Sequence, residues 1–388
     1  MDETVFKARI ITGLAEVNAE DWNRVANPAA LSYDPFLSWE FLEALEVSGA
    51  ARPETGWSPC HVLIEGPGDE LLAAMPLYAK TNSQGEFVFD HSWADAYERA
   101  GGNYFPKLLS AVPFTPVTGR RFLIPPGPDQ SRLQDALLSA ALQVAAQNDF
   151  SSLHVNFVEP DFATEMAETG LLVRTDQQFH WHNDGYGHFD DFLGALSSAK
   201  RKNLRKERAK AQIGLSFKHL TGDQIEAHHW DAFFEFYMDT GARKWGYPYL
   251  NRDTFTLLGE RLADKILLIL AYEDDIPIAG ALNLIGSDTL YGRYWGCTDP
   301  RPFLHFETCY YQAIDYAIAH GLSTVEAGAQ GGHKLARGYV PVTTYSAHWI
   351  AHKGLRDAID HYLERERDAV EHESKYLQKR TPFRKDQP

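Results

Sequence analysis

The chain has 388 residues, of which 44% are hydrophobic and 13% aromatic, and it carries a formal net charge of -16. This length allows two domains of ordinary size, each with its own core, and the composition excludes a largely disordered chain. The acidity argues against DNA binding, although one basic groove on an acidic body can still hold a tRNA end or a nucleotide.

The three cysteines, Cys60, Cys297 and Cys309, stand far apart and form no Cys-x-x-Cys pair. This spacing supports neither a disulfide framework nor a zinc site, so we expect three buried thiols and no metal. The first residues lack the basic and apolar pattern of a signal peptide, and no apolar stretch reaches the roughly 18 residues of a membrane span. We therefore expect a cytoplasmic protein without a membrane span.

The first half of the chain alternates strand and helix signals. Residues 60–78 predict a β-hairpin around the turn Gly-Pro-Gly-Asp, because two apolar runs flank residues that favour tight turns. A third strand is expected at residues 85–90. A helix at 130–147 and a buried strand at 152–158 then complete the pattern.

The second half repeats this order, which predicts a duplicated α/β domain with the boundary near residues 160–180. The corresponding segments are a hairpin at 266–285, a strand at 289–295, a helix at 306–319 and a strand at 323–328. Gly321 follows the helix where a C-cap is expected. Residues 354–377 predict an amphipathic helix with one thin apolar stripe.

Between the two halves, residues 197–210 hold seven basic side chains and one acidic side chain within fourteen positions. The rest of the chain then carries -22, so this segment is a candidate site for an anion such as phosphate. We assign Arg201, Lys202, Arg205 and Lys206 to the anionic part of one substrate. A basic helix can also serve only as a solvated face.

The segment from Gly328 to Gly338 leaves a predicted strand and collects polar side chains among four glycines. Lys334 and Arg337 are candidates to hold a phosphate or carboxylate, since Arg binds such groups in bidentate geometry. His333, with Gln330 beside it, is a candidate catalytic residue, because imidazole titrates near neutral pH and can take a proton from an attacking amine. Glycine-rich segments can also be plain turns.

A second polar cluster follows the third predicted strand, and its candidate substrate-binding residues are His91, Trp93 and Tyr97. His91 and Ser92 are adjacent, so they do not face each other as the nucleophile and base of a hydrolase would. His180, His182 and His188 match no metal-binding spacing. Asp190 or Asp191 is expected to cap the helix that precedes the basic segment.

The hairpin, strand, helix and strand order resembles the GNAT acyltransferase fold, and its duplication resembles the Fem-type peptidyltransferases. The basic segment 200–210 is similar to the start of their second domain. Closer still are the Fem-like predicted N-acyltransferases of Gram-negative bacteria, which the chain resembles in segments 91–101, 104–121, 179–183, 328–339 and 344–350. The resemblance implies tandem GNAT-like α/β (α+β) domains with central mixed sheets, at residues 1–170 and 171–353, and a C-terminal helix and tail at 354–388.

The same resemblance implies transfer of an acyl or aminoacyl group to an amine by direct attack, with Tyr345 among the catalytic residues. The donor is acyl-CoA or aminoacyl-tRNA, and the acceptor is a small-molecule or cell-wall-precursor amine. Neither half contains the Arg/Gln-x-x-Gly-x-Gly/Ala loop that cradles the pyrophosphate of coenzyme A in GNAT enzymes. This absence favours a larger or differently held donor. The alternative is a binding module that recognises an anionic ligand or a protein partner.

Overall fold

The computed structural model describes residues 6–244, 248–328 and 331–384. The chain forms two compact units, unit 1 (Met1–Asp176 and Thr343–Glu371) and unit 2 (Gln177–Val342 and His372–Pro388). This division differs from the expected boundaries after residues 170 and 353, because residues 343–371 belong to unit 1. None of the helices in the described residues combines the length and the apolar character needed to cross a membrane.

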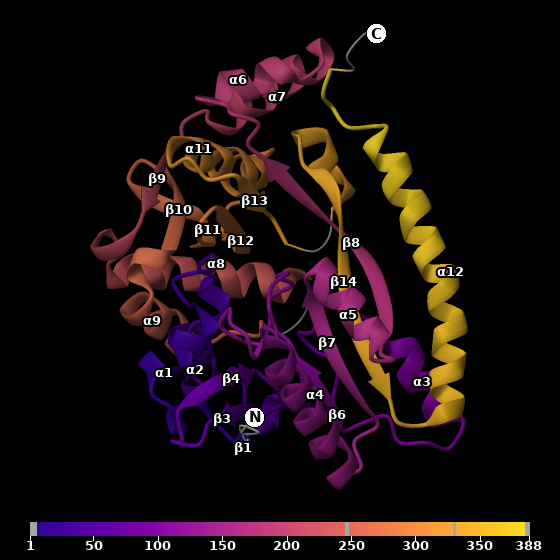
Figure 1. Ribbon diagram of the computed structural model, residues 1–388. Coiled ribbons are helices and arrows are strands. Elements are labelled where there is room, and N and C mark those ends of the chain that lie inside the picture. Colours follow the sequence, from indigo (N-terminus) through magenta and orange to yellow (C-terminus); the bar gives the residue numbers. More distant parts are fainter. Residues whose placement is uncertain (1–5, 245–247, 329–330, 385–388) are drawn as a thin grey trace. The chain divides into compact units, whose positions relative to one another are not determined.

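Unit 1 contains two sheets, with strand orders β1-β3-β4 and β2-β5-β6-β7-β14 (Figure 1). Its strands are β1 (Lys7–Ile11), β2 (Trp57–Pro59), β3 (His61–Glu65), β4 (Leu71–Met75), β5 (Tyr78–Lys80), β6 (Lys107–Ser110), β7 (Ser152–Val158) and the unit 1 part of β14 (Val340–Ile350). Its helices are α1 (Ala19–Ala26), α2 (Trp39–Val47), α3 (His91–Arg99), α4 (Gln130–Gln147) and α5 (Pro160–Glu168). The hairpin expected at 60–78 is confirmed by the antiparallel pairing of β3 with β4.

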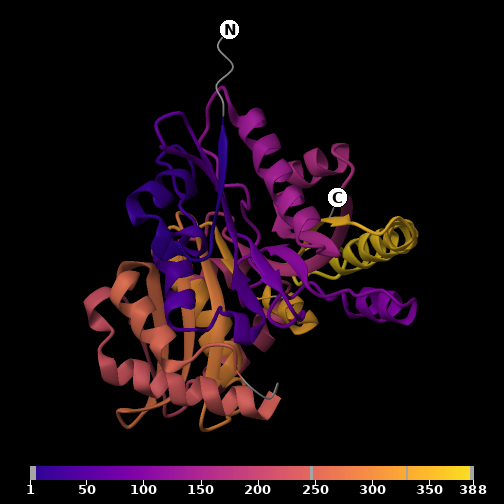
Figure 2. The same ribbon diagram turned by 90° about the horizontal axis from the view of Figure 1, so that it is seen from below.

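Helix α4 packs on β1, β3, β4 and β7, and Figure 2 shows the indigo strand β1 running beside this helix. The alternation of side chains along a strand decides which face meets α4. Leu108, Leu153 and Ala347 belong to the apolar cluster under the helix. Their neighbours Lys107, His154 and His348 therefore point to the opposite face, where they are almost completely buried.

The strand expected at residues 85–90 is absent, which corrects the predicted repeat. Gly85 and Phe87 have positive φ angles of 75° and 59°, and such angles break an extended strand. The segment is instead a loop that carries Glu86 and Asp90 toward Lys107. The apolar run in this segment of the sequence did not reveal the loop, because the lysine that holds the two carboxylates comes later in the chain.

Unit 2 contains the sheet β8-β13-β12-β11-β10-β9. Its strands are β8 (Leu172–His182), which begins in unit 1, β9 (Ser216–Leu220), β10 (Ile266–Glu273), β11 (Ile276–Ile285), β12 (Thr289–Cys297) and β13 (Thr324–Glu326). Its helices are α6 (Phe189–Ala195), α7 (Ser198–Ala211), α8 (Ala227–Lys244), α9 (Arg252–Arg261), α10 (Leu304–Phe306), the π-helical turn η6 (Glu307–Tyr311), α11 (Gln312–Ala319) and the 3-10 turn η7 (Gly332–Arg337). Helix α12 (Lys353–Gln378) begins in unit 1 and ends in unit 2.

Helices cover both faces of this sheet. Ile269 and Ala281 share an apolar cluster with residues of α11, whereas Gly280, next to Ala281 on β11, faces α8. A Cβ at Gly280 would lie 2.9 Å from the Phe233 ring of α8, so the close approach of α8 depends on glycine there. The expected hairpin at 266–285 is confirmed, and Gly321, with φ of 68°, directly follows the C-cap His320 of α11.

Candidate functional site

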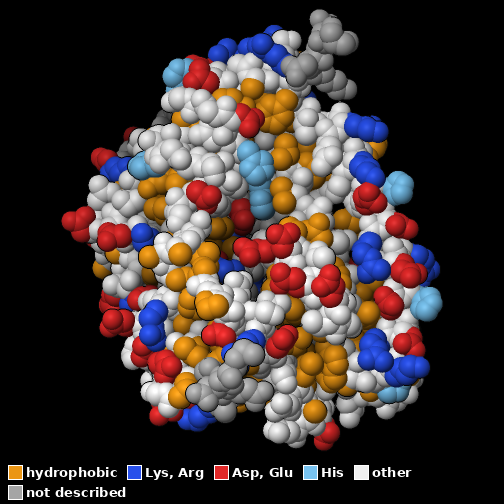
Figure 3. Space-filling view, viewed as in Figure 1, with side chains coloured by type: hydrophobic (Ala, Val, Ile, Leu, Met, Phe, Trp, Pro, Cys, Tyr) orange, Lys and Arg blue, Asp and Glu red, His pale blue; other side chains and the backbone are white. Residues whose placement is uncertain are grey.

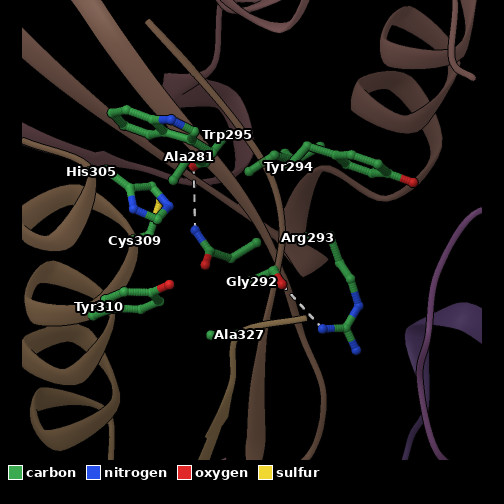
Figure 4. A pocket seen from close by; sticks show the side chains of 11 residues that line it. Ala281, Gly292, Arg293, Tyr294, Trp295, His305, Cys309, Tyr310 and Ala327 are labelled. Atoms are coloured by element: carbon green, nitrogen blue, oxygen red, sulfur yellow. Dashed lines mark hydrogen bonds between the residues drawn. The ribbon is translucent and has the colours of Figure 1, made fainter. Parts of the chain in front are cut away.

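A pocket opens in unit 2 where two parallel strands part. Within the described residues, β12 and β13 pair from Thr289 with Thr324 to Tyr291 with Glu326, and β12 extends beyond this pairing to Cys297. The pocket has a volume of about 110 Å³, enough for a small chemical group but not for a nucleotide. Its lining comes from β11, β12, the residue after β13, and the segment α10–η6: Ala281, Leu282, Asn283, Gly292, Arg293, Tyr294, Trp295, His305, Cys309, Tyr310 and Ala327 (Figure 4).

A β-bulge shapes the strand side of this pocket. Leu282 pairs with Tyr294 but Asn283 pairs with Gly292, so Arg293 is the extra residue on β12. Figure 4 shows the Arg293 side chain extending away from the side on which His305, Cys309 and Tyr310 lie. Its guanidinium donates to Glu326 Oε2 at 2.7 Å, and both side chains are almost fully buried. The pair fixes the end of β13 at the edge of the pocket.

The helical side of the pocket supplies three groups able to take part in chemistry. His305 lies on α10, and Cys309 and Tyr310 lie on the π-helical turn that follows it. Turns of this kind insert an extra residue and often occur at functional sites. Cys309 is half-buried and lines the pocket, and Cys60 is also half-buried. The expectation of three buried thiols was therefore wrong for these two residues.

Among the residues predicted from the glycine-rich segment, His333 is linked to the pocket through one side chain. Its Nε2 lies 2.9 Å from the hydroxyl of Tyr310, which lines the pocket. Burial raises the pKa of Tyr310, so this hydroxyl keeps its proton at neutral pH. Gln330 lies outside the residues that the structure describes.

Lys334 is buried, and its ammonium donates to the carbonyl oxygen of Gly328 at 2.8 Å. Burial, together with the smaller effect of the positive charge of Arg293, lowers the pKa of Lys334 to about 7. A lysine with this pKa is about half neutral at pH 7, whereas an exposed lysine is fully charged. This environment suits proton exchange better than the predicted binding of a phosphate.

The side chain of Arg337 is held in place by contacts within unit 2. Its guanidinium donates to Glu207 Oε2 at 2.9 Å and to the carbonyl oxygen of His333 at 2.7 Å, and it lies 3.3 Å from the centre of the Phe306 ring. These contacts engage both terminal nitrogens of the side chain. Arg337 therefore fixes the shape of the glycine-rich segment next to α10.

The basic segment forms α7, and its cations divide into two groups. Arg208 donates to Glu307 and Asp315, and the exposed Arg205 pairs with Asp190 at 2.9 Å. Lys202 and Lys206 are exposed and Arg201 is half-buried, and none of the three has an ion-pair partner in the described ranges. Figure 3 shows blue side chains gathered where Figure 1 places α6 and α7. Asp191 caps α6 by accepting from the backbone of Gly187 and His188, as expected for one of the two aspartates.

The remaining predicted residues lie in unit 1. His91 is exposed at the start of α3, Trp93 is buried, and Tyr97 contacts the His352 ring with centres 5.5 Å apart. Tyr345 lies on β14 opposite Val158 and packs against the apolar cluster under α4. Trp93 thus packs in the interior of unit 1, Tyr97 is half-buried against the same cluster, and Tyr345 packs on the core under α4.

Unit 1 also contains a buried polar network that the sequence did not indicate. The Lys107 ammonium donates to Asp90 and to Glu86, the latter at 2.7 Å, and the Tyr104 hydroxyl donates to Asp90 at 2.7 Å. Burial acts to raise the pKa of Asp90, but the charge of Lys107 outweighs it and the pKa falls. Burial raises the pKa of Glu86 to about 7.

The network continues across the sheet through two histidines. His154 Nε2 contacts the Ser152 hydroxyl at 2.8 Å, and His154 Nδ1 lies 2.7 Å from His348 Nδ1. One imidazole must donate and the other must accept, so the pair cannot carry two positive charges. Burial lowers the pKa of His154 to about 3 and that of His348 well below its usual value. Both rings are neutral at physiological pH.

A model of the FemAB-like family, described as peptidoglycan biosynthesis/recognition, matches residues 13–385. The chain belongs to the FemAB-like family. No curated protein matches this FemAB-like chain in sequence. In the described part of the chain, no group of three or more His, Cys, Asp or Glu side chains is arranged to hold a metal ion.

Two of the similar solved structures, those with TM-scores above 0.5, share the fold of this FemAB-like chain. FemX aligns with 91% of this chain and 100% of its own, at 14% identity and a TM-score of 0.55. The C-terminal domain of a putative lysylphosphatidylglycerol synthetase from Agrobacterium fabrum aligns over 89% and 97%, at 9% identity and a TM-score of 0.53. A tandem GNAT protein from the clavulanic acid biosynthesis pathway aligns over 90% and 99%, at 12% identity and a TM-score of 0.47. The expected Fem-like mixed α/β fold is confirmed.

Most of the residues that line the pocket of this FemAB-like protein were not predicted from the sequence, although one signal was present. Asn283 is the only strongly polar residue in the apolar run from Ile276 to Ile285. A lone amide in a strand buried on both faces needs hydrogen-bond partners, so it marks a position with a special role. Arg293, His305, Cys309 and Tyr310 gave no comparable signal, because the bulge and the π-helical turn that aim them are set by tertiary packing.

Proposed function

We propose that this FemAB-like protein is an N-acyltransferase that moves an acyl or aminoacyl group from a thioester or ester donor to an amine. The observation that carries the proposal is the pocket at the parting of β12 and β13, with Tyr310 on its wall and His333 behind Tyr310. A strand edge beside a small cavity and a path for the proton are the parts that direct acyl transfer needs.

The edge of β12 beyond Tyr291 is suited to the donor carbonyl. A backbone N–H group of β12 at this edge can donate to the oxygen of a carbonyl placed beside it. Such donors stabilise the negative charge that develops on this oxygen when the amine attacks. The pocket volume of about 110 Å³ matches the reacting groups, and the remainder of the donor extends outside it.

Tyr310 and His333 provide a path for the proton that the amine loses. As the C–N bond forms, the amine nitrogen gives a proton to the Tyr310 oxygen while the Tyr310 hydroxyl passes its proton to His333 Nε2, 2.9 Å away. The bond between the carbonyl carbon and the donor sulfur or oxygen then breaks, and the leaving group takes up a proton. No covalent intermediate with the protein is needed.

The donor is acyl-CoA or aminoacyl-tRNA, both of which carry phosphates. Lys202, Lys206 and Arg201 on α7 are the cations of unit 2 that we assign to these phosphates. We propose an amine of a cell-wall precursor as the acceptor, in line with the description of the family, and a small-molecule amine as the alternative. The reaction would take place in the cytoplasm, where both donors are made.

Thermal unfolding with candidate donors tests the proposal. Acetyl-CoA, a longer acyl-CoA and an aminoacyl-tRNA are each added to the wild type and to a Lys202→Ala/Lys206→Ala variant. A donor present at 100 times its Kd should add about 2.7 kcal/mol to the free energy of unfolding. Lys353→Ala, an exposed substitution in unit 1, is the control and should keep the shift.

Mass spectrometry of the products completes the test. Formation of an N-acylated amine by the wild type, and its loss in Tyr310→Phe, would support transfer in this pocket. Affinity for a tRNA donor should fall steeply with added salt, while affinity for acyl-CoA should fall less, because tRNA makes more phosphate contacts. If no donor shifts unfolding and no product forms, the chain is a binding module instead.

A further inference from the structure

The side-chain amide of Asn283 on β11 is fixed in orientation, and its nitrogen makes hydrogen bonds while its oxygen has no partner in the described residues. Its side chain is completely buried, and Nδ2 donates to the carbonyl oxygens of Leu267 at 3.2 Å and Ala281 at 3.3 Å. Carbonyl oxygens only accept, so the nitrogen must face them and Oδ1 must point the other way. Oδ1 has no hydrogen-bond partner within the described residues, and Asn283 lines the pocket.

A glycine keeps space beside this oxygen. Gly292 is the residue opposite Asn283 across the bulge. A Cβ at Gly292 would lie 3.2 Å from Asn283 Oδ1 and 3.3 Å from the carbonyl oxygen of Glu326, which is closer than most real Cβ contacts. The position that a side chain would take at Gly292 therefore lies between two acceptor oxygens at the parting of the strands.

Two acceptor oxygens select a ligand group with N–H donors. A carboxylate or phosphate would be repelled there, and an apolar group would leave the buried Oδ1 without a partner. A carbonyl oxygen has two lone pairs, so Glu326 can accept from a ligand in addition to any bond within the sheet. A primary amine has enough hydrogens to donate to both oxygens.

We propose that Asn283 Oδ1 binds the attacking amine of the acceptor substrate, in a slot that Gly292 keeps open. This inference rests on the proposed function and specifies its acceptor as a primary amine. With one N–H on Asn283 and one on Glu326, the nitrogen lone pair is left to attack the donor carbonyl. A secondary amine can make only one of these bonds.

Two simple cations test the slot without any acyl donor. Methylammonium chloride has three N–H donors, whereas tetramethylammonium chloride has the same charge and none. We expect methylammonium, compared at equal concentration with tetramethylammonium, to raise the melting temperature of the wild type in a dose-dependent way. Gly292→Ala should abolish the difference, and the control Gly194→Ala on α6, where an added Cβ meets nothing within 4 Å, should keep it.

Equal effects of the two cations on the wild type, or an unchanged difference in Gly292→Ala, would overturn the inference. If Gly292→Ala does not fold, Asn283→Ser replaces it, since serine keeps a hydroxyl donor and removes the amide oxygen. This measurement is independent of catalysis. A methylammonium effect without any acyl transfer would reject the proposed function and keep the N–H site.

Kinetics then show which substrate donates the N–H group. In Gly292→Ala we expect KM for a primary amine to rise at least 10-fold, with KM for the acyl donor unchanged. Wild type should also prefer a primary amine over its N-methyl derivative, and the variant should lose this preference. A rise in KM for the acyl donor alone would assign the slot to an amide of the donor and overturn the role of Asn283 in amine binding.

Discussion

Lys334 shows how the surroundings of one residue can change its chemistry. The sequence predicts a cation that binds phosphate, because lysine among glycines is typical of such loops. Folding instead buries the ammonium against the Gly328 carbonyl oxygen, and burial with the nearby Arg293 charge lowers its pKa to about 7. The role of Lys334 stays a prediction, and its protonation depends on packing that the composition does not specify.

The lowered pKa of Lys334 predicts how stability changes with pH. Between pH 7 and about 10.5 the unfolded chain holds a proton on this amine that the folded chain lacks, so unfolding takes up a proton. The free energy of unfolding should therefore rise with pH, by about 1.4 kcal/mol per pH unit for this group. Denaturant titrations at pH 7.5 to 9 should show the rise, and Lys334→Met should reduce its slope by this amount.

Lys80 in unit 1 provides an internal comparison, because burial lowers its pKa to about 7 as well. Lys334→Met should therefore leave part of the slope, and adding Lys80→Met should remove more of it. An unchanged slope in Lys334→Met would show that the folded protein keeps this ammonium charged.

A lone polar residue inside an apolar strand is the signal that the sequence offered for Asn283, which is completely buried. The buried residues Lys107, His154 and His348 stand among other polar residues of their strands, so the sequence did not single them out. Their partners were hidden as well, because Lys107 meets Glu86 and Asp90 only after a loop with positive φ angles has folded back.

At the scale of elements, helix α7 separates cations that stabilise the fold from cations that face solvent. Arg208 donates to the completely buried Glu307 at 3.2 Å and to Asp315, whereas Arg205 makes one exposed pair with Asp190. Burial raises the pKa of Glu307, and the Arg208 charge opposes this rise. The local sequence does not show which of the seven basic residues stabilise the fold, because their ion pairs form only through tertiary contacts.

This difference predicts unequal costs of substitution. Arg208→Met leaves Glu307 buried without its cation and should lower the free energy of unfolding by about 3 kcal/mol. Arg205→Met, the matched control on the same helix, should cost less than about 1 kcal/mol, because exposed pairs contribute little. Circular dichroism during denaturant unfolding measures both. Equal losses would mean that α7 is not anchored through Arg208.

Elements with strong local signals were predicted within a residue or two. Helix α4 occupies the expected residues 130–147, and α12 covers the expected 354–377 with its apolar stripe of Leu355, Ile359 and Leu363 buried. Helical periodicity and caps are local, so the sequence contains them. The prediction of a strand at residues 85–90 was wrong, because a short apolar run alone cannot distinguish a strand from a loop held by buried ion pairs.

At the scale of the whole molecule, the order of the chain does not follow the two units. The chain leaves unit 1 after Asp176, returns to it at Thr343 and leaves again after Glu371. The repeat in the sequence indicates two consecutive halves, so it does not show that the chain crosses between the units three times. The cause is that β14 pairs with β7 of the first half, from Tyr345 opposite Val158 to Ile350 opposite Ser152.

The crossing predicts that the first half cannot fold by itself. A fragment of residues 1–176 lacks β14, so β7 loses a strand partner, and it also lacks Ile350, Leu355, Ile359 and Leu363, which bury Trp93 and Tyr104. The free energy of unfolding of a domain is only a few kcal/mol, so exposing an unpaired strand and this apolar cluster should be enough to unfold the fragment. We expect the fragment to show no cooperative thermal unfolding, and coexpression with a peptide of residues 343–371 to restore it. Cooperative unfolding of residues 1–176 alone, at a temperature close to that of the full chain, would show that β14 and α12 are additions to a complete domain.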